Sequence, residues 1–332
     1  MKKRIIIITL IALGFVVGAA TEKKTDFISY TKNMLITHTP WDDTKDKKWG
    51  SEFREVSIPS SIGSSPQKAM FLSATQKAPL LISLHTWSGD YKQHDPLSEK
   101  AAMSGWNYIH PDFRGPNSTT DACLSEQALA DIDDAVTYAI NNGNVDSANI
   151  FVVGVSGGGY AGLGSYLKTK HKINTFMVWV PISDLNLWYK QSRDRKSTYS
   201  EDILACTDSG KDIDSKSARL RSPLHWNLPK DERRIEIYAG INDGHTGSVP
   251  VSHSILFFNK LARQYDKTKQ IDVEETVMIL DRNIERFNEA KSIGNRELIF
   301  ERKAGPASIY IFDGTHEMLT DYAFNRIESL IQ

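Results

Sequence analysis

The stretch GVSGG, residues 154–158, constrains the fold of this chain more than any other. It fits the pattern G-x-S-x-G and lies between an apolar run, residues 150–155, and a segment of helical character, residues 159–170. A serine at such a junction occupies a sharp turn, and side chains larger than the flanking glycines would collide with the neighbouring strand or helix. The motif therefore predicts a strand, a tight turn and a helix, with the Ser156 hydroxyl raised above a sheet. A phosphate-binding loop is the alternative, but the stretch has neither the lysine of a P-loop nor the spacing of a dinucleotide fingerprint.

Short apolar runs and amphipathic stretches alternate along the rest of the chain. The runs of strand character are residues 52–59, 67–75, 78–86, 106–115, 149–156, 173–184, 233–243 and 307–316. The helical stretches are residues 125–143, 159–170, 252–266 and 273–291. This alternation predicts an α/β fold, with a mostly parallel central sheet and helices on both faces. Residues 185–230 are too long for a simple connection and are predicted to form a cap over the strand ends, where chemistry collects in such sheets.

A serine nucleophile needs an imidazole to take its proton and a carboxylate to hold that imidazole. In this topology the three follow one another as serine, acid and histidine. His316 follows the last predicted strand in a short loop that contains glycine, and it is the predicted base. Asp243 ends the preceding strand just before a glycine and is the predicted acid, with Asp184 and Asp313 as alternatives.

Two backbone amides are candidates for stabilising an oxyanion. The amide of Gly157 opens the helix directly after Ser156, where the N–H groups at a helix start favour negative charge. The amide of Trp87, in the loop after the strand at 78–86, is the predicted second donor, and its indole is expected to form a wall of the acyl pocket. The alternative for Trp87 is a purely packing role.

Candidate side chains for substrate binding lie near the predicted strand ends and in the cap. Tyr160 and Trp188 are predicted to offer aromatic surface to a substrate, and their alternative is a place in the core. Arg114 is a further substrate-binding candidate, and its alternative role is to hold the strand ends by hydrogen bonds. Glu201 and Asp202, in the cap, are the one carboxylate pair that we single out as a candidate for holding a peptide amine.

The first residues of the chain have the composition of a secretory signal. The basic start MKKR is followed by an apolar stretch, residues 5–18, and by small residues at 18–20. Residues 1–20 are therefore predicted to be a signal peptide, 21–50 a surface segment and 51–332 the catalytic domain. An uncleaved anchor is the alternative, although the apolar stretch is shorter than the roughly 20 residues that span a bilayer. We expect a secreted or periplasmic protein without a stable membrane partner.

The charges nearly balance, with 40 Lys and Arg against 41 Asp and Glu and a net charge of −1. No basic field therefore points to nucleic acid. The predicted chemistry implies no metal or cofactor, and the expected partner is a small-molecule or glycan ester substrate. Cys123 and Cys206 are the two cysteines, and the sequence leaves open whether they form a disulfide.

Several motifs in their order along the chain resemble the α/β-hydrolase superfamily and, within it, the prolyl oligopeptidase-like branch. They are LLISLHTWSGD, PDFRGPN, SEQALADIDDAVTYA, FVVGVSGGGYAG, VPISD, RSPLHW, GINDGHTGSVP and DGTHEM. The resemblance implies an α/β-hydrolase fold with Ser156 as nucleophile, Asp243 and His316 as its partners, and Gly157 with Trp87 around the oxyanion.

The chain also departs from that branch. Its peptidases usually carry a large N-terminal β-propeller, which the roughly fifty residues before the predicted sheet cannot form. Residues 85–87 read HTW where many relatives have HGG or GGP. The expected function is therefore a carboxylic-ester hydrolase, acting on carbohydrate or aromatic esters. A prolyl oligopeptidase-like peptidase and a non-catalytic cell-surface binding module are the alternatives, and acyl transfer stays open.

Overall fold

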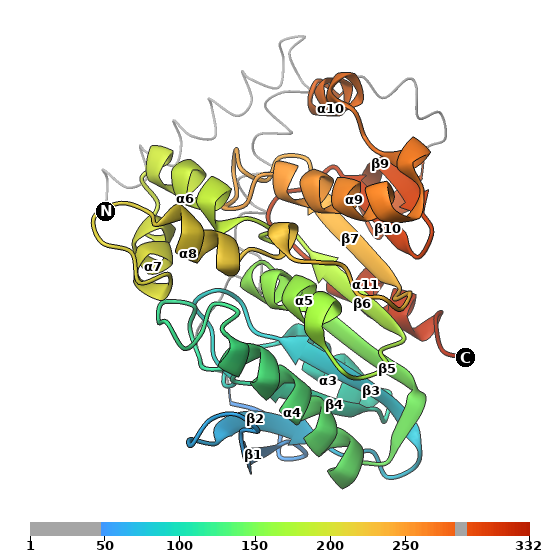
Figure 1. Cartoon of the computed structure of the whole chain (residues 1–332). Helices are drawn as coiled ribbons and strands as arrows, with labels where there is room; N and C mark the ends of the chain where they lie inside the picture. Colours follow the sequence, from blue (N-terminus) through green and yellow to red (C-terminus); the bar gives the residue numbers. More distant parts are fainter. Residues whose placement is uncertain (1–47, 283–290) are drawn as a thin grey trace, which may run out of the picture. The chain divides into compact units, whose positions relative to one another are not determined.

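The structure, a computed structural model, describes residues 48–282 and 291–332 (Figure 1). All of them belong to one compact unit, residues 40–332. The predicted signal peptide and most of the predicted surface segment lie outside the described residues, so both stay predictions. Within the described ranges, no helix combines the length and the apolar character needed to cross a membrane.

One ten-stranded sheet organises the unit, in the order β1-β2-β4-β3-β5-β6-β7-β10-β9-β8. Its strands are β1 (Arg54–Ile58), β2 (Gln67–Leu72), β3 (Ala78–Leu84), β4 (Asn107–Pro111), β5 (Val145–Val155), β6 (Thr175–Trp179), β7 (Ile235–Gly240), β8 (Ser292–Ile293), β9 (Arg296–Ala304) and β10 (Ala307–Phe312). Six neighbouring strands in the middle of the sheet are parallel: β4, β3, β5, β6, β7 and β10. At the two edges β1, β2, β8 and β9 pair antiparallel. The predicted mostly parallel sheet is confirmed.

Helices cover both faces of the sheet. On one face lie α4 (Glu126–Asn142), α5 (Gly157–Lys168) and α9 (Ser252–Tyr265), and on the other lie α3 (Pro96–Met103) and α11 (Thr320–Glu328) (Figure 1). Each face has its own apolar cluster, with Ile132, Leu163 and Phe258 on the first and Leu97 and Phe324 on the second. The central strands are therefore buried on both sides, which explains their nearly continuous apolar sequences.

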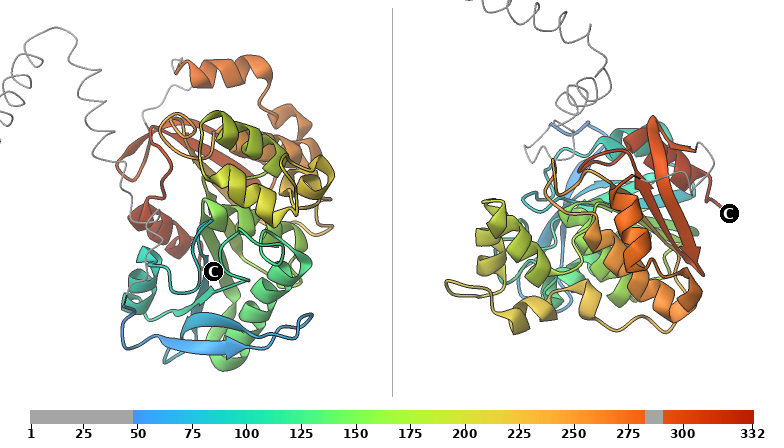
Figure 2. Two further views of the ribbon diagram at one scale, coloured as in Figure 1. Left: turned by 90° about the vertical axis from the view of Figure 1, so that its left-hand side faces the viewer. Right: turned by 90° about the horizontal axis from the view of Figure 1, so that it is seen from above.

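The segment between β6 and β7 forms α6 (Leu185–Asp194), α7 (Tyr199–Cys206), α8 (Ser215–Leu220) and the 3₁₀ turn η1 (Pro223–His225). These helices occupy the predicted cap, residues 185–230, and lie beside one another in Figure 2. Aspartates begin two of them: Asp184 accepts hydrogen bonds from the first-turn amides of α6, and Asp214 does so for α8. The predicted helix at 273–291 is described only in part, as α10 (Val273–Leu280).

His253 connects α9 to the cap and gives the fold a dependence on pH. Its Nδ1 accepts from the Ser183 amide at 3.1 Å, and its Nε2 lies 2.9 Å from Gln191 Oε1. A neutral ring with its proton on Nε2 satisfies both partners, and burial lowers the His253 pKa from 6.5 to about 4. Between these two pH values the unfolded chain binds a proton that the folded chain does not, so stability is lost as pH falls from 6.5 towards 4.

We expect this histidine alone to remove about 3 kcal/mol of unfolding free energy at pH 4 relative to pH 7. The measurement is urea unfolding between pH 4 and 7.5 for the unmodified protein and for His253→Asn, whose side-chain oxygen can still accept from the Ser183 amide. The variant lacks the group that takes up this proton, so its unfolding free energy should fall by about 3 kcal/mol less between pH 7 and pH 4. Equal pH slopes for the two proteins would contradict the assignment.

Candidate active site

Ser156 occupies the tight turn between β5 and α5. Its backbone angles are φ 57° and ψ −117°, a left-handed conformation that a non-glycine residue rarely adopts. The turn is so close that a Cβ on Gly154 would lie 2.1 Å from Gly158 O, and one on Gly158 would lie 2.1 Å from Leu84 O. Glycines are therefore required on both sides of the serine.

The ends of three sheet strands bring Ser156, His316 and Asp243 together. His316 Nε2 lies 2.8 Å from Ser156 Oγ, and its Nδ1 lies 2.7 Å from Asp243 Oδ2. The other oxygen of Asp243 accepts from the amides of Gly244, at 2.9 Å, and Val249, at 3.0 Å. With the proton on Nδ1, facing the carboxylate, Nε2 is free to accept the serine proton. All three side chains are buried.

The two rival aspartates have other partners. Asp184 caps α6 and places its Oδ2 2.9 Å from His225 Nε2. Asp313 forms an exposed ion pair with Arg282 at 2.8 Å. The geometry therefore supports Asp243 as the acid, at the end of β7, the neighbour of the strand that precedes His316.

The amides of Gly157 and Trp87 lie next to each other beside Ser156. A Cβ on Gly157 would come within 2.2 Å of Trp87 N, so the two backbones are in direct contact. The carbonyl of Thr86, on the same peptide as the Trp87 N–H, contacts His85 Nδ1 at 2.8 Å and accepts from the Gly89 amide at 3.2 Å. A trans peptide directs its C=O and N–H to opposite sides, so these contacts fix the direction of the Trp87 N–H.

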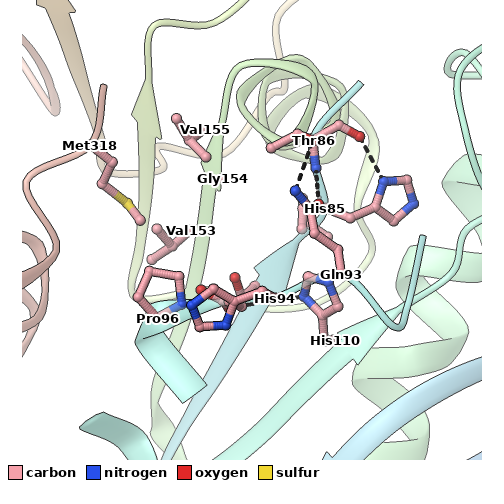
Figure 3. A pocket seen from close by; sticks show the side chains of 13 residues that line it. His85, Thr86, Gln93, His94, Pro96, His110, Val153, Gly154, Val155 and Met318 are labelled. Carbon is pink, nitrogen blue, oxygen red and sulfur yellow. Dashed lines mark hydrogen bonds and ion pairs between the residues drawn. The ribbon is translucent and has the colours of Figure 1, made fainter. Parts of the chain in front are cut away.

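Gln93 holds the same loop from a second direction. Its Oε1 accepts from the Thr86 amide at 2.8 Å and its Nε2 donates to Thr86 Oγ1 at 2.9 Å (Figure 3). Sequence reasoning missed both His85 and Gln93 as supports of this loop. No local pattern identifies them, because each acts through a peptide group that only the folded loop presents.

The aromatic residues predicted to bind substrate lie inside the protein. Tyr160 is fully buried, and its hydroxyl donates to the Arg221 carbonyl at 2.6 Å. Trp188 is also fully buried, with its indole N–H on the Ser248 carbonyl at 2.8 Å and its ring 4.7 Å from that of Trp87. These contacts correct the prediction: both residues form the wall behind the site and attach the cap to it, with their polar groups already bonded to the protein.

Arg114 also has a structural partner. Its guanidinium forms an ion pair with Asp131 at 2.6 Å and donates to the Ser65 carbonyl at 3.0 Å, and its side chain is only 12% exposed. The alternative role, holding the strand ends, thus fits the structure, whereas substrate binding does not.

Helix α7 of the cap is attached to two loops of the site. Its last residue, Cys206, forms a disulfide with Cys123, and the Cα atoms are 6.0 Å apart. One turn earlier, Asp202 Oδ2 accepts from the indole N–H of Trp87 at 3.2 Å. The position of this helix is therefore tied to the loop that carries the candidate oxyanion donor.

Helix α6 and the residue after it hold the loop that carries the acid. The Ser248 carbonyl accepts from Trp188 and, at 2.7 Å, from Arg195, which also donates to the Gly244 carbonyl at 3.0 Å. The amides of this loop in turn bind Asp243. Sequence reasoning missed this role of Arg195, because its partners are backbone carbonyls about fifty residues away in the chain.

No metal site accompanies this arrangement within residues 48–282 and 291–332: no group of three or more His, Cys, Asp or Glu is placed to hold an ion there.

The fold and the arrangement of serine, histidine and aspartate define a serine hydrolase with an α/β-hydrolase fold. The family model described as "Prolyl oligopeptidase family" matches residues 102–276, and the chain belongs to this family. A search of curated proteins found no match.

Solved structures share the fold at low sequence identity. An acylaminoacyl peptidase in complex with Z-Gly-Gly-Phe-chloromethyl ketone is 15% identical, with a TM-score of 0.57 over 83% of this chain and 40% of that chain. A puromycin-hydrolyzing peptidase of Mycobacterium tuberculosis is 15% identical, with a TM-score of 0.57 over 84% and 38%. Apo prolyl oligopeptidase B of Galerina marginata is 14% identical, with a TM-score of 0.53 over 84% and 35%. The alignments thus cover at most 40% of the length of these three proteins.

Proposed function

We propose that the protein is a serine peptidase that hydrolyses amide bonds through an acyl-enzyme on Ser156. The observation that carries the proposal is the continuous hydrogen-bonded chain from Ser156 Oγ through His316 to Asp243. Membership of the prolyl oligopeptidase family supports amide substrates. The names of the structural neighbours, an acylaminoacyl peptidase and a puromycin-hydrolyzing peptidase among them, agree with this choice.

In the proposed reaction, Ser156 Oγ attacks the scissile carbonyl carbon while His316 Nε2 takes the hydroxyl proton. The resulting oxyanion accepts from the N–H groups of Gly157 and Trp87. His316 then gives the proton to the leaving amine as the C–N bond breaks, and water attacks the acyl-enzyme with His316 again as base. Asp243 stabilises the imidazolium in both halves of the reaction without taking its proton.

Ester hydrolysis, the function expected from the sequence alone, is the second candidate. An ester carbonyl enters the same site and forms the same acyl-enzyme, with an alcohol in place of the amine. Residues 85–87, which read HTW where many relatives of the peptidase branch have HGG or GGP, support this candidate.

A matched pair of substrates separates the two candidates. The p-nitroanilide and the p-nitrophenyl ester of one acyl group, N-acetylalanine, differ only in the bond that is cleaved. A peptidase should turn over both, and both activities should disappear in Ser156→Ala. Turnover of the ester with no detectable anilide cleavage would favour the esterase. No turnover together with no labelling by a fluorophosphonate would overturn both and leave a binding module.

We also propose that the protein is exported. The basic and apolar start of the sequence supports a signal peptide, and the Cys123–Cys206 disulfide suits an oxidising compartment, where such bonds persist. Expression of the full chain with fractionation and N-terminal sequencing tests this: a mature protein that begins near residue 21 outside the cytoplasm is expected. Retention of residues 1–20 on a cytoplasmic protein would contradict it.

A further inference from the structure

A carboxylate without a cationic partner lies at the edge of the candidate site. Asp202 on α7 is partly buried and accepts one hydrogen bond, from the indole N–H of Trp87 at 3.2 Å. In the part of the chain that the structure describes, no Lys, Arg or His forms an ion pair with it. Its sequence neighbour Glu201 adds a second negative charge.

Three arginines of the cap, Arg193, Arg195 and Arg221, do not neutralise this charge, because each has other partners; Arg193 lies near Asp194 and Asp212. Arg195 donates to the carbonyls of Gly244 and Ser248. Arg221 donates to backbone carbonyls of residues 120–123. Burial raises the pKa of the Asp202 carboxyl, against the lowering effect of the Trp87 hydrogen bond. The folded protein thus keeps a partly desolvated acid whose charge is stabilised by one hydrogen bond but by no cation of the described residues.

Asp202 contacts a residue of the candidate active site, so the lack of a cationic partner among the described residues bears on substrate binding. The backbone N–H of Trp87 lies beside Gly157, the residue after Ser156, and its indole N–H donates to Asp202. One residue therefore connects the candidate oxyanion donor to this acid. Because like charges repel, a carboxylate bound to the residue that carries the candidate oxyanion donor opposes the reaction unless a positive group of the substrate offsets it. A perturbed carboxylate at such a site is typical of a functional group.

We propose that Asp202 determines specificity by binding a cationic group of the substrate, a protonated amine or a guanidinium. The inference rests on the proposed function, since it requires hydrolysis at Ser156. Glu201, which is exposed, adds negative potential that attracts the cation.

The test compares Asp202→Asn with Glu201→Gln as a control for charge. Asparagine keeps an oxygen that can accept from the Trp87 indole but removes the charge. The substrates are the anilides and esters of N-acetyl-lysine and its neutral analogue N-acetyl-norleucine, and of alanine with a free or an acetylated amine. For at least one of these pairs, the unmodified protein should prefer the cationic member. Asp202→Asn should lower kcat/KM for that member about tenfold or more, mainly through KM, and leave the neutral member within about twofold. Glu201→Gln should cause a smaller loss.

Intact hydrolysis with no preference for a cationic member, or an equal loss on cationic and neutral members, would overturn the role of Asp202 while leaving the proposed function in place. If no substrate is hydrolysed, the proposed function fails, and the role of Asp202 is then tested by a binding measurement alone. Calorimetry on Ser156→Ala, with peptides that present lysine, norleucine or a free amine, should show a preference for the cationic peptide that Asp202→Asn removes. Equal binding of all the peptides would overturn the inference.

Discussion

Replacing Ser156 by alanine is expected to reduce kcat by a factor on the order of 10⁴ to 10⁶, with little change in fold. The hydroxyl lies 2.8 Å from His316 Nε2, and alanine leaves no atom that can form the acyl-enzyme. The oxyanion donors belong to the backbone and remain, so a residual rate above the uncatalysed reaction should survive. Steady-state kinetics and labelling by a fluorophosphonate measure the two effects independently.

Ser308→Ala is the matched control for this variant. Ser308 is also a buried serine, but it lies near the beginning of β10, at the opposite end of the strand from His316. It should keep hydrolysis within about twofold. Substantial turnover by Ser156→Ala, or a comparable loss in Ser308→Ala, would remove Ser156 from the role of nucleophile.

Replacing Asp243 by asparagine should reduce kcat by about 10⁴-fold. Asparagine Oδ1 can still accept from the amides of Gly244 and Val249, as the Asp243 oxygen does. Its NH₂ group then faces His316 Nδ1, which must accept, and the ring proton moves to Nε2. An imidazole in that tautomer cannot take the proton of Ser156, so the base is lost although the geometry is kept.

Asp313→Asn tests the rival acid in the same assay. Asp313 is partly exposed and paired with Arg282, so its amide should retain activity within about twofold. A large loss in Asp313→Asn with near-normal activity of Asp243→Asn would transfer the role of the acid to Asp313.

The centre of the fold and the edge formed by β1 and β2 could be read from the sequence, whereas the opposite edge, β8 and β9, could not. The parallel strands β3, β5, β6 and β7 are buried on both faces and appear as apolar runs. Strand β9, second from the edge, is partly exposed and has a short apolar run, residues 298–300, between charged residues at 296–297 and 301–303, and sequence reasoning missed it. Helix α3 was missed although Asp95 and Pro96 give it a clear start, since it is only eight residues long.

The residues of the candidate site also differ in whether they could be predicted from the sequence. Ser156, Asp243 and His316 follow strands whose order in the sheet is fixed by the fold, so their meeting could be predicted from local motifs. The Trp87 contact with Asp202 joins residues 115 positions apart, through a side chain that no motif specifies. Tyr160 illustrates the opposite error. It was expected to contact substrate, but its hydroxyl donates to the Arg221 carbonyl inside the protein.

The Cys123–Cys206 disulfide closes a covalent ring across a sequence separation of 83 residues, and this ring contains Ser156. A ring of this size restricts the unfolded chain enough to stabilise the fold by roughly 4.5 kcal/mol in the loop-entropy model. It also changes the outcome of proteolysis. Lys196 lies exposed within the ring, so a protease that cuts the chain there produces two peptides that stay covalently joined. The peptide with Ser156 is thereby retained beside the one with Asp243 and His316, and the nicked protein remains a single molecule.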